Sequence, residues 1–114
     1  LARQIIEHYA DDLNHNDSII TGDFNLYHRN GTQNKTADIL EINDLLNSLG
    51  FKSIYHKLRG EAFGSETEKT YFHQFKEENA FFLDYTYSNF PIKKYELLPW
   101  DNDFSDHRGQ VIEF

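Results

Sequence analysis

Helical and strand-like apolar patterns alternate along this chain, and this alternation is the sequence feature that most restricts its fold. Apolar residues recur at helical spacing within residues 2–14 and again within residues 39–49. Short apolar or aromatic runs bounded by polar turn residues follow each helical segment. Because interleaved helices and strands pack as layers around a sheet, the sequence predicts an α/β fold.

The first expected strand is a short buried one over residues 18–21, directly before a glycine. The second helix has expected caps at both ends. Thr36 or Asp38 is placed to cap its start, and Gly50 stands where a left-handed C-terminal cap belongs.

A hairpin is expected later in the chain, from residues 70–75 and 81–87 joined by a polar turn at 76–79. Other strand-like runs flank it on both sides. They cover residues 51–57, 95–98 and 111–114.

The composition narrows the class of protein. A chain of 114 residues suits one small domain, and a net charge of −8 opposes non-specific binding to a phosphate backbone. The absence of cysteine excludes disulfides and thiolate metal sites. No apolar run is long enough for a membrane span, so none is expected. Since the chain lacks methionine and opens at Leu1 inside a predicted helix, we expect residues to precede it in the intact protein.

Two polar residues, Asp23 and Asn25, directly follow the first predicted strand. Catalytic and ligand-binding groups collect at the carboxyl ends of strands in α/β proteins. Glycine, aspartate and asparagine also form tight turns, so a purely structural turn is the alternative interpretation of this segment.

Asp84 lies within the aromatic run 82–87, where strand alternation places Phe82, Asp84 and Thr86 on one face. Both faces of this strand look largely buried. A buried carboxylate is costly unless it is paired or hydrogen-bonded, which favours a functional role. The alternative is an edge strand with Asp84 facing water.

Asp106 and His107 stand just before the last predicted strand. A hard cation such as Mg²⁺ prefers oxygen ligands, so Asp106 suits it. A histidine such as His107 is able to move a proton or contact a phosphate. Taken alone, an Asp-His pair on a surface is usually just solvated.

Taken in order, the three segments resemble the motifs of the endonuclease/exonuclease/phosphatase superfamily. Residues 20–25 (Ile-Thr-Gly-Asp-Phe-Asn) are similar to its Gly-Asp-x-Asn motif, and residues 83–85 (Leu-Asp-Tyr) to its Asp-Tyr strand motif. Residues 105–108 (Ser-Asp-His-Arg) resemble its closing Ser-Asp-His signature. Each motif alone is common, whereas their order and spacing are specific, and together they span most of the chain.

The resemblance implies a pancreatic-deoxyribonuclease-like fold, a four-layer α/β/β/α sandwich of two similar halves. Residues 1–114 would form the C-terminal half, with a mostly antiparallel mixed sheet and flanking helices. The implied activity is Mg²⁺-dependent hydrolysis of phosphoester bonds by a phosphodiesterase, nuclease or phosphatase, with Mn²⁺ as an alternative cofactor.

The resemblance also implies a role for each motif residue. Asp23 would orient or deprotonate the attacking water, and Asn25 would bind the phosphate or that water. Asp84 would hold His107 in the correct tautomer, as the carboxylate does in a Ser-His-Asp site. His107 would contact the scissile phosphate or transfer a proton, and Asp106 would help to hold the metal. Whether Asp23 or His107 is the base stays open.

The family's first half carries an asparagine, a metal-binding glutamate and a further histidine or tyrosine at the phosphate, and no segment here takes their place. We therefore expect this chain alone to be inactive, its partner being the missing N-terminal half of the same protein. An exposed apolar face would also favour self-association of the fragment. Gly109 stands where the family often has proline.

The alternative function is a non-catalytic binding or scaffold domain that kept the fold. The sequence does not resolve the phosphoester substrate; nucleic acid and a small phosphodiester are candidates, and the acidic charge favours a small phosphoester or an unspecified substrate over duplex DNA. We expect residues 27–35, 59–69 and 100–104 to shape its pocket. Trp100 either stacks on the substrate or packs inside the domain. The sequence assigns no compartment, and its basic residues are scattered, at positions such as Lys52, Lys57, Arg59, Lys93, Lys94 and Arg108.

Overall fold

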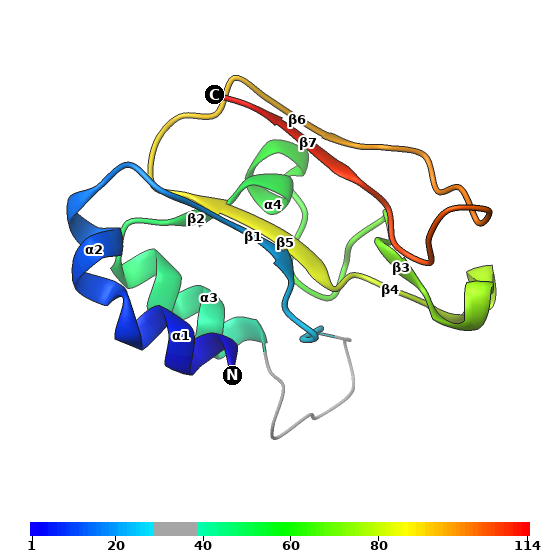
Figure 1. Ribbon diagram of the computed structural model, residues 1–114, viewed down its shortest axis with the longest axis horizontal. Coiled ribbons are helices and arrows are strands. Elements are labelled where there is room, and N and C mark those ends of the chain that lie inside the picture. The colour runs from blue at the N-terminus through cyan, green and yellow to red at the C-terminus, as the bar shows by residue number, and fades with distance from the viewer. Residues whose placement is uncertain (29–38) are drawn as a thin grey trace.

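The central strand of the main sheet is β5 (Asp84–Ser88), flanked by β1 (Ile19–Asp23) and β2 (Lys52–Ser53) in the order β1–β5–β2 (Figure 1). Both pairings are antiparallel. The computed structural model describes residues 1–28 and 39–114 and has a mixed α/β fold. All five residues of β5 are buried, and the strand has neighbours on both sides, so the edge-strand interpretation of Asp84 is wrong.

The first helical segment is divided into α1 (Ala2–His8) and α2 (Ala10–His15). The sequence pattern had predicted one helix over residues 2–14. Tyr9, at the junction, has φ −100° and ψ 12°. Its amide still donates to the carbonyl of Ile5 at 3.1 Å, so the break is a kink in a continuous helical path.

The second helix, α3 (Ile39–Ser48), ends as predicted. Gly50 has a φ of 88°, and the amide of Phe51 reaches back to the carbonyl of Leu46 at 2.9 Å. A left-handed glycine of this kind satisfies the last carbonyls of a helix. The expected N-terminal caps, Thr36 and Asp38, lie outside the described residues.

The strand predicted over residues 51–57 is wrong beyond Ser53. The chain continues there as α4 (Ile54–Arg59), which ends at Gly60 with a φ of 66°. Ile54, Tyr55 and His56 are buried in succession on this short helix. A short apolar run fits either a strand or a buried helix, and here packing of α4 against β5 decides for the helix.

Only the short segments 71–72 and 80–81 pair as the predicted hairpin. β3 (Tyr71–Phe72) pairs antiparallel with β4 (Ala80–Phe81), and the single-turn 3₁₀ helices η1 (His73–Phe75) and η2 (Glu77–Asn79) connect them. The run expected as one strand over residues 81–87 breaks at residues 82–83. Its second part, β5, leaves the hairpin because it pairs with β1 and β2 instead.

The last two strands, β6 (Lys94–Leu97) and β7 (Gln110–Glu113), form an antiparallel pair of their own. Both were expected within one residue of these limits. Every strand pairing in residues 1–28 and 39–114 is antiparallel, so the parallel component of the expected mixed sheet is not found there. None of the described helices is long and apolar enough to cross a bilayer.

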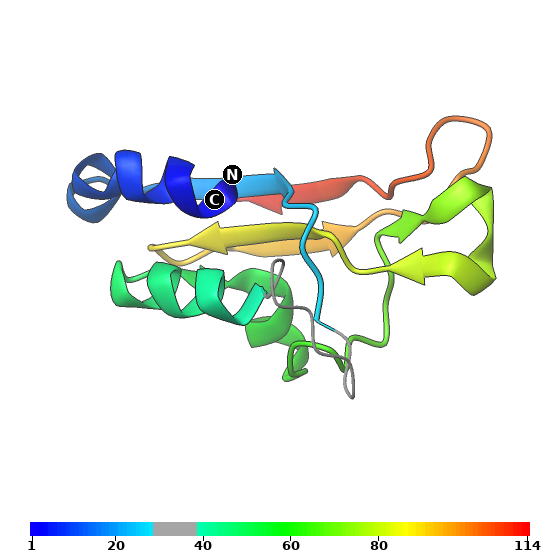
Figure 2. The ribbon, with the colours of Figure 1, turned by 90° about the horizontal axis from the view of Figure 1, so that it is seen from below.

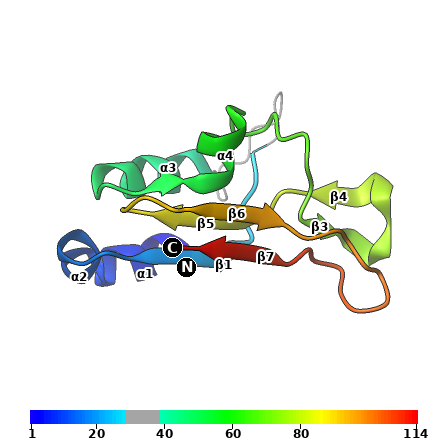
Figure 3. The same cartoon turned by 90° about the horizontal axis from the view of Figure 1, so that it is seen from above.

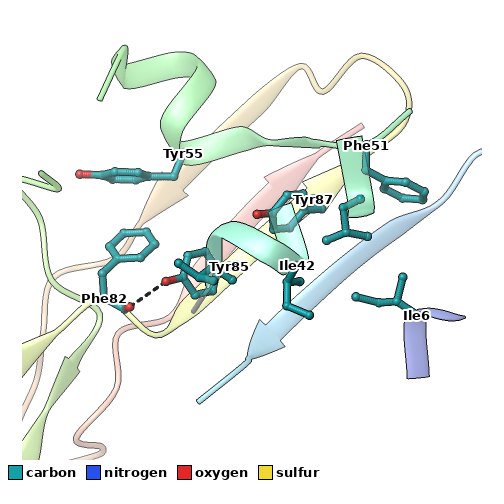
Figure 4. Packing of buried hydrophobic residues seen from close by; sticks show 9 residues of the cluster. Ile6, Ile42, Phe51, Tyr55, Phe82, Tyr85 and Tyr87 are labelled. Carbon is teal, nitrogen blue, oxygen red and sulfur yellow. Dashed lines mark hydrogen bonds between the residues drawn. The ribbon is translucent and has the colours of Figure 1, made fainter. Parts of the chain in front are cut away.

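The core lies between β5 and the helices: in Figures 2 and 3, α1 and α2 lie level with β1, and α3 and α4 lie on the opposite side of β5. Tyr85 and Tyr87 project from β5 into it, as Figure 4 shows. The Tyr85 hydroxyl donates to the carbonyl of Phe82 at 3.1 Å, so its buried polar atom is satisfied. Aromatic rings and branched aliphatic side chains make up this cluster: Ile6, Ile39, Ile42, Leu46, Phe51, Tyr55, Phe82, Tyr85 and Tyr87.

Candidate functional site

Two aspartates lie directly opposite each other on neighbouring strands of the main sheet. Asp23 is the last residue of β1, and its partner in the antiparallel register is Asp84, the first residue of β5. Like charges directly opposite each other destabilise a sheet. A positive or hydrogen-bonding group between these carboxylates offsets that repulsion.

His107 is that group. Its Nδ1 lies 2.9 Å from Asp84 Oδ2 and 3.2 Å from Asp84 Oδ1. An ionised carboxylate only accepts hydrogen bonds, so Nδ1 carries a proton and donates it to Asp84. Asp84 is buried, whereas the His107 side chain is 29% exposed. The inner aspartate thereby fixes the tautomer of an imidazole that solvent reaches.

The second ring nitrogen of His107 points toward Asp23. Its Nε2 lies 3.8 Å from Asp23 Oδ2, which is too long for a hydrogen bond. With Nδ1 protonated, a neutral imidazole has its lone pair on Nε2. This nitrogen and the Asp23 carboxylate are therefore both available to a third partner.

A sharp turn holds the Asp23 carboxylate in place. Asn25 has a φ of 54°, in the left-handed region that asparagine tolerates, and its amide donates to Asp23 Oδ1 at 2.8 Å. Phe24 packs on Tyr85 and Tyr87 in the core. The segment does form a tight bend, and this bend fixes the Asp23 carboxylate beside His107, whereas a functional role for Asp23 stays a prediction.

The segment that carries His107 is attached to the start of the hairpin. The amide of Phe72 donates to the carbonyl of Asp106 at 2.7 Å, and the amide of Arg108 donates to that of Thr70 at 2.8 Å. A β-bridge pairs Tyr71 with His107, whose rings lie 4.7 Å apart. The sequence pattern had not singled out Thr70 as a site residue or Tyr71 as a neighbour of the imidazole.

Arg108 fixes this segment further. Its guanidinium donates to Glu68 Oε2 at 2.7 Å and to the backbone carbonyls of Leu97, Leu98 and Lys69. These bonds connect the polar loop after α4 with the end of β6. Contacts of the residues immediately before and after His107 therefore fix its position.

Asp23, Asp84 and His107 each offer a donor atom within 4.8 Å of the others, a grouping able to hold a metal ion. Asp106, the expected metal ligand, is not in this group. His107 reaches the group from a β-bridge with Tyr71, and a metal-ligand role for Asp106 stays a prediction. Two carboxylates and an imidazole suit Mn²⁺ at least as well as Mg²⁺, which prefers oxygen ligands alone.

Trp100 packs within the domain. Its indole stacks on Phe72 with ring centroids 4.0 Å apart, and its Nε1 donates to the carbonyl of Ser105 at 2.9 Å. Both contacts support the packing interpretation and place Trp100 against the segment before His107. Direct contact of Trp100 with a substrate stays a prediction.

A cavity of about 490 Å³ adjoins Asp23 and Asn25, within the size range of small-molecule sites. Its walls come from α1, β1, the turn after β1 and α3. Of the segments expected to shape a pocket, 59–69 and 100–104 contribute no lining residue to this cavity. In the segment 27–35, residues from 29 onward lie outside the described part.

Burial raises the pKa of two phenols close to the site, those of Tyr85 and Tyr95, with the Asp84 carboxylate as a smaller cause. The Tyr95 hydroxyl donates to Gln110 Oε1 at 2.8 Å. These tyrosines act as neutral hydrogen-bond donors around neutral pH.

In comparisons with known proteins, no family model, curated protein or solved structure matches this chain.

Proposed function

We propose that Asp23, Asp84 and His107 form the catalytic centre of a metal-dependent phosphoester hydrolase of the endonuclease/exonuclease/phosphatase superfamily. The supporting observation is the convergence of three motif residues from separate segments into one group within 4.8 Å. Residues 1–114 then form the C-terminal half of the four-layer sandwich, and the intact protein supplies the other half.

In this proposal His107 is the group that accepts or returns a proton at the substrate. The Asp84 carboxylate holds Nδ1 at 2.9 Å and keeps the proton there, so Nε2 is the nitrogen able to accept or return a proton at the substrate. A fixed carboxylate also stabilises the imidazolium that forms when His107 takes up a proton. Asp84 is thus a positioning group, and His107 the group that meets the reacting atoms.

Asp23 is the partner of His107 on the solvent side. Its Oδ1 is held by the Asn25 amide, so Oδ2 is free to accept a hydrogen bond from a water molecule and orient it. The Asn25 side chain is exposed beside it and has the donor needed for a phosphoryl oxygen. Either Asp23 or His107 can serve as the base in this arrangement.

The divalent cation implied by the family, Mg²⁺ or Mn²⁺, fits these residues in part. Asp23 Oδ2 and His107 Nε2 are the donors available to it, since Asp84 is engaged with Nδ1. When bound, such an ion neutralises charge on the phosphate and acidifies water. In the proposed half-domain architecture, further ligands come from the missing N-terminal half.

The test is hydrolysis of a chromogenic phosphodiester and a phosphomonoester by the intact protein, with Mg²⁺, Mn²⁺ or a chelator. We compare wild type with His107→Ala, and with His15→Ala as a matched control, since His15 is an exposed histidine of α2. We expect metal-dependent turnover that only His107→Ala abolishes. No turnover of either substrate by wild type would favour the non-catalytic alternative.

A further inference from the structure

Thr70 is fully buried and stands at the junction of the two segments that carry Asp84 and His107. It immediately precedes β3 and is 0% exposed. Its amide donates to the carbonyl of Phe81 at 2.9 Å, and its carbonyl accepts from the amide of Arg108 at 2.8 Å. One residue thus connects the end of β4 with the segment after His107.

The hydroxyl of Thr70 makes a third and less common connection. Its Oγ1 accepts from two consecutive backbone amides, Leu83 at 2.9 Å and Asp84 at 3.1 Å. These amides lie where β4 ends and β5 begins. A hydroxyl oxygen has two lone pairs, so this single side chain satisfies both amides.

These two hydrogen bonds fix the position of the backbone from which the Asp84 side chain projects. On the other edge of the same stretch, the carbonyl of Leu83 accepts from the amide of Phe24. The backbone at Leu83 and Asp84 is therefore held between β1 and the Thr70 hydroxyl. The Thr70 carbonyl holds Arg108, the residue next to His107, in the same way.

We propose that Thr70 is a positioning residue that sets the Asp84–His107 hydrogen bond through its hydroxyl. The catalytic meaning of this inference rests on the proposed function, whereas the positioning itself does not. A β-branched side chain has few rotamers, so threonine presents its oxygen in a fixed direction. Valine has nearly the same shape but no acceptor, and serine keeps the acceptor without the methyl group.

The intact protein is used for a direct spectroscopic test. The ¹⁵N chemical shifts of the His107 ring report its tautomer, and we expect its Nδ1 proton to exchange slowly while it is bonded to Asp84. We compare Thr70→Val and Thr70→Ser with wild type. Thr86→Val is the matched control, because Thr86 is also fully buried in β5 and bonded through its hydroxyl, to Thr21 and Gln110.

We expect wild type, Thr70→Ser and Thr86→Val to retain the Nδ1-protonated tautomer and the slow proton. Thr70→Val should lose the slow proton and show mixed tautomers. An unchanged His107 signature in folded Thr70→Val would overturn the proposal. If Thr70→Val does not fold, Thr70→Ser still decides, since a folded serine variant without the signature shows that the hydroxyl is not what positions the pair.

Turnover by the intact protein then tests the catalytic meaning separately. Thr70→Val should lower kcat by roughly tenfold to a hundredfold at unchanged KM, the effect of a small misplacement of a catalytic group, and serine should recover most of it. Equal kcat for wild type and Thr70→Val overturns the catalytic part. If wild type hydrolyses no phosphoester, the proposed function fails, while the His107 spectrum still decides the positioning role.

Discussion

The hydrogen bond between Asp84 and His107 is the central contact of the candidate site, and a double-mutant cycle measures its strength. The cycle compares Asp84→Ala, His107→Ala and the double variant with wild type. Each single change removes the bond, and the double variant corrects for everything else that each change does. The result bears on the geometry of the site independently of any activity.

The structure sets the size of the expected coupling. The Nδ1–Oδ2 distance is 2.9 Å, the bond involves an ionised carboxylate, and Asp84 is buried. Hydrogen bonds to charged groups contribute about 1.5–3 kcal/mol. Because His107 is 29% exposed, solvent screens the pair and we expect about 1–2 kcal/mol.

Urea unfolding of the four proteins at pH 7 gives the coupling free energy directly, provided that the slopes of the transitions agree. A value within about 0.5 kcal/mol of zero is what independent sites show. Such a result would refute the inference that Asp84 holds His107.

Three further predictions follow from the same structure. The Thr67 hydroxyl is the main cause that lowers the pKa of Glu61 to about 2, so its stabilising contribution is lost as pH falls from 4.5 toward that value. Urea unfolding between these pH values should therefore show a shallower loss of stability for Glu61→Gln than for wild type. Burial raises the pKa of Tyr85, Tyr87 and Tyr95 above 10, so the free energy of unfolding should fall as pH rises beyond that value. In an ultraviolet titration these three phenols should ionise only when the protein unfolds. Residues 1–114 alone should show no Mg²⁺-dependent turnover, and robust turnover abolished by Asp106→Ala would contradict the half-domain proposal.

Local pattern was enough to predict much of the fold. Alternation in the 82–87 run gave the correct result that both faces of β5 are buried. Gly50 correctly marked the end of α3 because a left-handed cap depends on the glycine itself. The pattern failed at α4, where only packing against β5 separates a short buried helix from a strand.

The candidate site depended more on contacts between distant segments. The residue types suggested Asp23, Asp84 and His107, but their proximity results from the β1–β5 register and from the bridge between Tyr71 and His107. The break between β4 and β5 involves the Thr70 hydroxyl, and one threonine at a loop end has no local signature. Asp106 was chosen for its chemistry, and the group within 4.8 Å consists of the two aspartates and His107 without it.

The most direct test of the proposed catalytic centre is the kcat of the intact protein on a chromogenic phosphodiester, measured for wild type and Asp23→Asn with Mg²⁺ or Mn²⁺. Asparagine keeps the shape of the aspartate side chain and an oxygen able to accept the hydrogen bond from the Asn25 amide. It removes the negative charge that faces His107 Nε2. We predict metal-dependent turnover by wild type that falls roughly a hundredfold or more in the variant, as for loss of a group that orients or deprotonates the attacking water. Equal rates would contradict a catalytic role for this site.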